Sequence, residues 1–248
     1  MPIGVVTGLP LEAGCLPSGL SGGAERTLVC RGGIGPERAE RAARRLLDCG
    51  ANALMSWGIA GGLDPSLPPG TLLVPKRLGN GVWLPVGGSW RDRLVEALRP
   101  RLRVSEGSLL HSDHTIASPA AKRDLYHAHG AGAVDQESSI VAAVARRAGV
   151  PFVALRAVAD PGIRTLPQEA ISALHADGTL RMEELLRGLL RRPAAATALP
   201  GLGMDVYRAR KSLRVAGQAL GSGFLAEEPG WQGSEAVSPA LARFRIGH

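Results

Sequence analysis

Apolar residues along this chain fall into two patterns, short continuous runs and longer stretches with helical spacing. The short runs are bounded by glycine, proline or polar residues and predict buried strands. They cover residues 3–7, 27–31, 53–57, 71–74, 108–111 and 151–158. The longer stretches repeat apolar positions every three or four residues, as one face of a helix does. They cover residues 36–50, 90–98, 119–129, 137–148, 167–175, 180–190 and 204–220.

This alternation of strands and helices predicts one sheet between helical layers. The run 151–158 is nearly all apolar, as expected of a central strand that is covered on both faces. After Arg191-Arg192-Pro193 the composition changes to an Ala/Pro-rich link. We therefore expect a main domain over residues 1–192 and a helical extension over 193–220. The Gly/Ser/Glu-rich residues 221–248 lack periodicity, so we expect a mobile tail there.

The net charge of +7 suggests an anionic partner, but the kind of basic residue argues against nucleic acid. All but three of the 29 basic residues are arginines, and they are scattered over many segments. Glu37 with Arg41 and Glu40 with Arg44 are pairs at helical spacing. Aromatic residues make up only 4%, too few for a platform on which bases stack. A solvated arginine-rich surface is the favoured interpretation, and contact with an anionic membrane stays open.

Other features of the sequence concern location and metals. There is no run of about 20 apolar residues to span a membrane, and the first residues lead into a strand without a basic segment or cleavage site. Cys15, Cys30 and Cys49 are odd in number and lack metal-ligand spacing, which favours free thiols in the cytoplasm. The stretch from His111 to His114 matches no zinc pattern, so we expect no metal.

Three acids stand where open α/β sheets place their ligands, at a strand end or a helix start. Asp160 ends the apolar strand, and a carboxyl group leaving a buried strand can have the raised pKa of a general acid. An Asp-Pro-Gly turn explains Asp160 equally well. Glu137 at a helix start is more often a cap, and Glu12 taken alone resembles an exposed loop acid. Gly33-Ile34-Gly35 lacks the full dinucleotide-binding motif.

Seven motifs occur in a fixed order over residues 1 to about 192. They are Ile3-Gly4-Val5-Val6 with Glu12, Gly33-Ile34-Gly35, Ser56-Trp57-Gly58-Ile59-Ala60-Gly61-Gly62-Leu63, Gly70-Thr71-Leu72-Leu73-Val74, Ser112-Asp113-His114-Thr115-Ile116, Val134-Asp135-Gln136-Glu137-Ser138 and residues 150–160. With this order and spacing the chain resembles the nucleoside phosphorylase and nucleosidase superfamily, above all the methylthioadenosine/S-adenosylhomocysteine nucleosidases.

Further details are similar to the hopanoid-associated phosphorylase group. They are Thr7-Gly8-Leu9, Gly61-Gly62-Leu63-Asp64-Pro65, Val134-Asp135, Asp160-Pro161, Leu166-Pro167 and Leu199-Pro200. The resemblance implies an N-ribosyl hydrolase that releases adenine from adenosylhopane, giving ribosylhopane in hopanoid (bacteriohopanepolyol) biosynthesis. It also implies a three-layer α/β/α sandwich with a central mixed, mostly parallel sheet, a homodimer and no cofactor. Such an enzyme would be cytoplasmic, or associated with the cytoplasmic face of an anionic membrane.

The resemblance also assigns roles to residues. Asp160 would protonate N7 of the purine, Glu12 would hold and deprotonate the attacking water, and Glu137 with Gln136 would contact the ribose. The loop of Ile59, Ala60 and Gly61 would border ribose and base. The purine pocket would be lined by Thr115, Ile116 and Phe152.

The chain departs from the superfamily at several positions. Gln136 replaces the usual methionine, Ala159 replaces a small hydroxyl residue that orients the acid, and Thr71 stands where an acid is usual. A phosphorylase commonly has an arginine just before its glycine-rich turn, because phosphate needs fixed donors. Here no basic residue lies between Gly50 and Lys76, which favours water over phosphate.

Three alternatives stay open: a phosphorylase that uses Arg26, Arg31 or a partner's arginine, a methylthioadenosine/S-adenosylhomocysteine nucleosidase, and a purine-binding sensor. Loss of the acids would mark the sensor, and all three acids are present.

Overall fold

The computed structural model describes residues 2–17, 27–221 and 224. Arg26 and almost all of the expected tail at 221–248 therefore lie outside the described residues. In the described part of the chain, no helix is long and apolar enough to cross a membrane.

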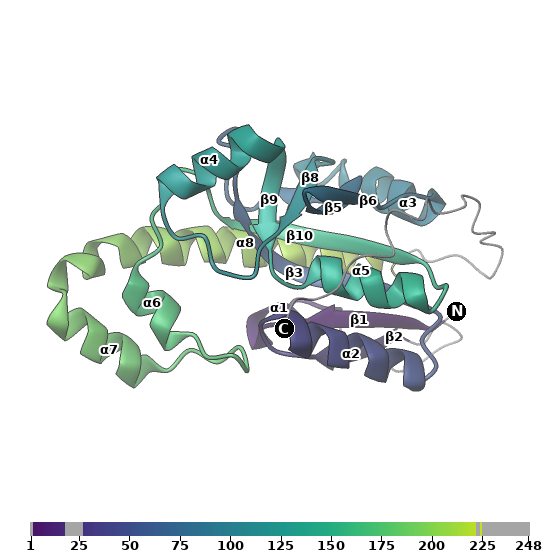
Figure 1. Cartoon of the computed structure of the whole chain (residues 1–248), viewed down its shortest axis with the longest axis horizontal. Helices are drawn as coiled ribbons and strands as arrows, with labels where there is room; N and C mark the ends of the chain where they lie inside the picture. Colours follow the sequence, from purple (N-terminus) through teal and green to yellow (C-terminus); the bar gives the residue numbers. More distant parts are fainter. Residues whose placement is uncertain (1, 18–26, 222–223, 225–248) are drawn as a thin grey trace.

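A single mixed sheet runs through the centre of the described part of the chain (Figure 1). Its strands are β1 (Ile3–Thr7), β2 (Thr27–Arg31), β3 (Ala53–Gly62), β4 (Leu72–Leu73), β5 (Arg77–Asn80), β6 (Val82–Pro85), β7 (Val104–Ser105), β8 (Ser108–His111), β9 (Ala131–Asp135) and β10 (Phe152–Asp160). The order is β6-β5-β8-β9-β3-β10-β4-β7, and β1 joins β2 to β3. Most pairs are parallel, and the antiparallel ones are β3–β9, β4–β10 and β5–β6.

Helices cover both faces of this sheet (Figure 1). They are α1 (Pro10–Ala13), α2 (Pro36–Asp48), α3 (Ser89–Leu98), α4 (Pro119–His129), α5 (Ser138–Arg147), α6 (Gln168–Ala173), α7 (Met182–Arg191), the 3-10 helix η1 (Pro193–Ala198) and α8 (Leu199–Leu220). Successive side chains of a strand point to opposite faces. Met55 and Trp57 of β3 accordingly lie in the core with α3 and α8, whereas Leu54 packs with α2 and α5. The predicted three-layer α/β/α sandwich with a mixed, mostly parallel sheet is confirmed.

Helix α8 belongs to this core. It starts at Leu199, earlier than the predicted 204, and runs along β10 (Figure 1). Its apolar residues Ala209, Leu213 and Ala216 are fully buried in the cluster formed with β3 and β10. The apolar face predicted for residues 204–220 is thus covered by the sheet.

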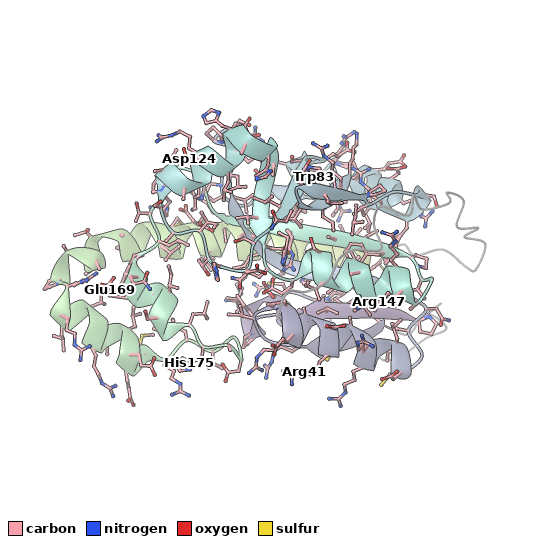
Figure 2. All side chains as sticks on the ribbon, in the orientation of Figure 1. Arg41, Trp83, Asp124, Arg147, Glu169 and His175 are labelled. Carbon is pink, nitrogen blue, oxygen red and sulfur yellow. The ribbon has the colours of Figure 1, made fainter. Side chains whose placement is uncertain are left out.

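Helices α6 and α7 have a different environment. They pack mainly on each other and on η1, and they extend beyond the end of the sheet (Figure 1). Several arginines on the surface of the sandwich form ion pairs. Arg44 and Arg147 both bind Glu40, at 2.8 and 3.0 Å, and Figure 2 shows Arg41 and Arg147 on the outer side of α2 and α5.

The sequence pattern missed the strands β5, β6, β7 and β9. β9 consists mainly of small residues, which lack the β-branched and aromatic signal of a strand. The β5–β6 hairpin turns at Asn80-Gly81, where Gly81 has φ 77°. Asn-Gly is a favoured hairpin turn, so this hairpin had a readable signal.

Candidate active site

A cavity of about 180 Å³ lies where the carboxyl ends of the parallel strands β1, β3 and β10 meet the start of α5. Glu12, Glu137 and Asp160, the three acids singled out in the sequence, all line it. Ligands of open α/β sheets bind in this region. The fold therefore brings Glu12 together with two carboxyl groups that lie more than one hundred residues later in the chain.

Glu12 lies in the one-turn helix α1 and is only 2% exposed. The interpretation of Glu12 as an exposed loop acid, made from its local sequence, is therefore wrong. Its Oε2 accepts hydrogen bonds from the backbone N–H groups of Gly8 (2.8 Å) and Leu9 (2.9 Å), and its Oε1 accepts one from Ile59 (2.9 Å). Burial raises the pKa of Glu12, against the lowering effect of Arg156 and these backbone donors. A carboxylate has about four acceptor positions, so this fixed group can still bind and deprotonate a water.

Arg156 is the buried cation of the site. Its Nε lies 2.8 Å from Asp135 Oδ2 and 3.0 Å from Ser138 Oγ, and its Nη2 lies 2.8 Å from Ser56 Oγ and 3.6 Å from Glu137 Oε2. A buried charge is stable only when it is paired and hydrogen-bonded. Arg156 therefore acts as the counter-ion for the carboxylates around it.

Glu137 is the N-cap residue of α5, but its side chain does not cap the helix. Asp135 accepts from the N–H of Ser138 in its place, at 3.3 Å. Glu137 Oε1 instead accepts from the N–H of Gly35, at 3.1 Å, where Gly35 has φ 100° at the start of α2. Burial raises the pKa of Glu137 to about 7, with Arg156 opposing and Asp135 adding to the rise. The cap interpretation of Glu137 is thus wrong, and its carboxyl group is left beside the cavity.

Asp160 is the last residue of β10 and follows a register shift against β3, where Val158 pairs with Ala60 and Asp160 with Gly61. Such an irregularity redirects a side chain. Lys122 from α4 donates a hydrogen bond to Asp160 Oδ2. Burial raises the pKa of Asp160 to about 6, although Lys122 lowers it. This pKa is suited to proton donation near neutral pH.

The other residues singled out in the sequence fall into two groups. Those that line the cavity are Gln136, Ile59, Ala60, Gly61, Thr115 and Ile116. The stretch at Ile59–Gly61, predicted as a loop, is the end of β3. Gln136 Nε2 donates to Thr115 Oγ1 over 3.3 Å, which joins two walls of the cavity.

Phe152 does not reach the cavity, which corrects the prediction that it lines a purine pocket. It begins β10, whereas Asp160 ends it, and eight strand steps span about 26 Å. Its side chain packs against the apolar clusters on the α2–α5 face of the sheet.

Sequence reasoning missed Arg156, Asp135, Lys122 and Gly58. Arg156 carried a signal, because a charged residue inside an apolar strand is seldom buried without partners. A Cβ atom at Gly58 would collide with Glu12 Oε1 and Arg156 Nη1, so this glycine allows the acid and the arginine to approach each other. Lys122 lies in the predicted helix 119–129, and a lysine on such a helix is normally exposed to solvent, so the sequence gave no signal that it belongs to the site.

Of the basic residues considered for phosphate, Arg31 lies among the described residues and Arg26 does not. Arg31 is exposed at the end of β2 and is not part of the cavity wall. Within the described ranges, no group of three or more His, Cys, Asp or Glu side chains could hold a metal ion.

Comparison with known proteins agrees with the fold. The structure is similar to 5′-methylthioadenosine/S-adenosylhomocysteine nucleosidase from Helicobacter pylori, with 18% identity, a TM-score of 0.64 and coverage of 89% of this chain and 96% of that one. It is equally similar to futalosine hydrolase of Helicobacter pylori, with 18% identity, a TM-score of 0.64 and coverage of 90% and 96%. S-adenosylhomocysteine nucleosidase from Streptococcus pyogenes matches with 19% identity, a TM-score of 0.59 and coverage of 77% and 96%.

These likenesses show the fold, and the sequence shows the family. The profile of the Phosphorylase superfamily matches residues 10–191, which include Glu12, Glu137 and Asp160. The predicted superfamily is confirmed: the chain belongs to the Phosphorylase superfamily.

Proposed function

We propose that this protein hydrolyses the N-glycosidic bond of an adenosine-containing substrate and releases adenine. The observation that carries the proposal is the placement of three carboxyl groups with different partners around one cavity, two of them buried and that of Glu137 largely so. Asp160 has a pKa raised to about 6, Glu137 has one raised to about 7, and Glu12 is fixed by three backbone donors. The nucleosidases of similar fold, named above for adenine nucleosides, support the substrate class.

In this mechanism each acid has one role. Protonated Asp160 gives its proton to N7 of the purine while the C1′–N9 bond breaks and its electron pair moves to the base. Glu137 accepts hydrogen bonds from the ribose hydroxyls, and the carboxylates stabilise positive charge on the oxocarbenium-like ribose. Glu12 takes a proton from water as the water oxygen bonds to C1′. The products are adenine and a ribose with a free C1′ hydroxyl.

Charge in the site favours water over phosphate. Arg156 is committed to Asp135, Ser56 and Ser138, and among the described residues no Lys or Arg side chain lines the cavity. A phosphate dianion would therefore meet carboxylates without free cationic donors. Phosphorolysis, which would give a ribose 1-phosphate product, is the runner-up and predicts a strict need for phosphate.

Exposed apolar residues that follow the cavity wall in the chain support a lipid-linked substrate. Leu174 lines the cavity and forms a β-bridge with Leu180, just before α7. Met182, Leu186 and Leu190 follow at four-residue spacing on α7 and are 57%, 55% and 82% exposed. We propose that the hydrocarbon of adenosylhopane lies on this α7 stripe (Met182, Leu186 and Leu190), so that cleavage gives ribosylhopane for hopanoid biosynthesis.

Basic residues next to the stripe support contact with an anionic membrane surface. The exposed Arg187 and Arg191 lie beside the α7 stripe and could face anionic headgroups while the stripe contacts lipid. A homodimer is part of the proposal, whereas a methylthioadenosine/S-adenosylhomocysteine nucleosidase with a small substrate would leave the stripe without a lipid role. Each 100 Å² of hydrocarbon buried stabilises binding by about 2.5 kcal/mol, so the lipid role is measurable as affinity.

The test uses purified protein with adenosine, methylthioadenosine and adenosylhopane, each with and without phosphate. We expect adenine release in phosphate-free buffer, with the highest kcat/KM for adenosylhopane. Leu186→Ser with Leu190→Ser should raise KM for adenosylhopane but not for adenosine, and Val82→Ser, at a position 44% exposed elsewhere, should change neither. Binding of adenine nucleosides without turnover would instead identify a purine sensor.

A further inference from the structure

Lys122 is a buried cation that the mechanism above leaves unused. It lies on α4 and is fully buried, which is rare for a lysine unless it is paired. The chain has only two other lysines. The side chain of Lys76 is 66% exposed, and Lys211 is exposed on α8.

All three N–H donors of the Lys122 ammonium group have acceptors. Nζ donates to Asp160 Oδ2, to the carbonyl oxygen of Pro161 at 3.3 Å and to that of Arg164 at 3.1 Å. An ammonium group has three donors and no acceptor. Its position relative to Asp160 and to the chain that follows β10 is therefore fixed.

We propose that Lys122 is the positioning residue of the acid: it holds Asp160 by Oδ2 and leaves Oδ1 to protonate N7 of the purine. This inference rests on the proposed function. Within the described ranges no donor bonds to Oδ1, whereas Oδ2 is bound. Ala159, directly before the acid, has no hydroxyl group that could orient it. Lys122 supplies that orientation from another element.

The lysine also stabilises the product of the proton transfer. When the proton leaves Asp160 Oδ1 for N7, the carboxylate that remains keeps its ionic bond to Lys122. Burial alone would raise the pKa of Asp160 further, and the adjacent charge of Lys122 opposes this rise. Asp160 thus stays a strong enough acid to donate near neutral pH.

Other charged groups around Asp160 come from two further elements. Arg164, in the chain after β10, binds Asp205 of α8, and Arg208 Nη1 lies 3.7 Å from Asp205. Asp205 raises the pKa of Asp160 and Arg164 lowers it, both less than Lys122 does. Helix α8 is thus connected to Asp160 through Arg164. The side chain of Arg164 binds Asp205 of α8, and its carbonyl oxygen accepts a hydrogen bond from Lys122. The extension takes part in the arrangement of the catalytic acid.

The test compares Lys122→Met, which removes donor and charge, with Lys122→Gln, which keeps a neutral donor, and Lys211→Met as the exposed control. Asp160 must be protonated to act, so activity falls as pH rises through its pKa. Loss of the Lys122 charge raises the pKa of Asp160. The alkaline limb of the kcat/KM profile should therefore shift toward higher pH, by at least about one pH unit, in both variants. We expect kcat to fall at least about tenfold in Lys122→Met and less in Lys122→Gln, with KM nearly unchanged.

A second readout does not need turnover. In protein labelled with ¹³C-aspartate, the Asp160 carboxyl signal, assigned by its absence in Asp160→Asn, should titrate at higher pH in both Lys122 variants. An unchanged limb and an unchanged titration in folded Lys122→Met or Lys122→Gln would overturn the inference. If the wild-type protein releases no adenine, the proposed function fails, and the titration still decides whether Lys122 controls the protonation of Asp160.

Discussion

Replacing Glu137 by glutamine should stabilise the protein at high pH, because the fold holds this carboxyl group where its charge is unfavourable. Burial raises the pKa of Glu137 from 4.5 to about 7. Between these two values the folded state binds more protons than the unfolded state. The stability that the group contributes is therefore complete below pH 4.5 and is lost as pH rises through 7. Glu137→Gln has no such loss.

The size of the effect follows from the pKa shift. One pKa unit corresponds to about 1.4 kcal/mol, so the full shift is worth about 3 kcal/mol, and about 2 to 3 kcal/mol of it develops between pH 5 and pH 8. The amide oxygen of glutamine can still accept from the N–H of Gly35. The unfolding free energy of Glu137→Gln minus that of the wild type should thus be about 2 to 3 kcal/mol larger at pH 8 than at pH 5.

Urea unfolding followed by circular dichroism at the two pH values measures this difference. A shift of this size moves the midpoint by about 1 M urea at typical slopes. Glu183→Gln is the control, since this side chain is 86% exposed. A variant–wild-type difference that is the same at pH 5 and pH 8, or that favours the wild type more at pH 8, would refute the reasoning.

Two further predictions concern the neighbours of Glu137. Arg156→Met should cost about 3–5 kcal/mol of unfolding free energy at pH 7, because it leaves buried carboxylates without a counter-ion. The cost should shrink as pH falls and these carboxylates take up protons, and a cost independent of pH in urea unfolding would contradict the counter-ion role. Glu12→Gln should retain the fold but lose adenine release in phosphate-free buffer, and a folded variant with wild-type rates would exclude Glu12 as the base.

The central part of the fold was predictable because its signals are local. Continuous apolar runs at β1, β2 and β10 and helical periodicity at α2 and α4 identify elements by residue spacing alone. β9 carried little of that signal, since alanine and glycine do not favour strands. The covered apolar face of α8 could not be told from a lipid-binding face, because periodicity shows that a face is apolar and says nothing about what covers it.

The candidate site was predictable only in part. Position at strand ends identified Glu12, Glu137 and Asp160, and the structure places all three on one cavity. Their partners could not be found this way, because Lys122 and Arg156 reach the acids through tertiary contacts across the sheet. Such contacts depend on how α4 and β10 pack, which no local pattern specifies.

The most direct test of the central claim is the rate of adenine release by wild type and by Asp160→Asn on one adenosine substrate in phosphate-free buffer. The wild-type protein should release adenine, and the folded variant should be slower by at least about 10²-fold, because an amide cannot donate the proton that N7 needs. A folded Asp160→Asn protein that keeps more than about a tenth of the wild-type rate would contradict the account.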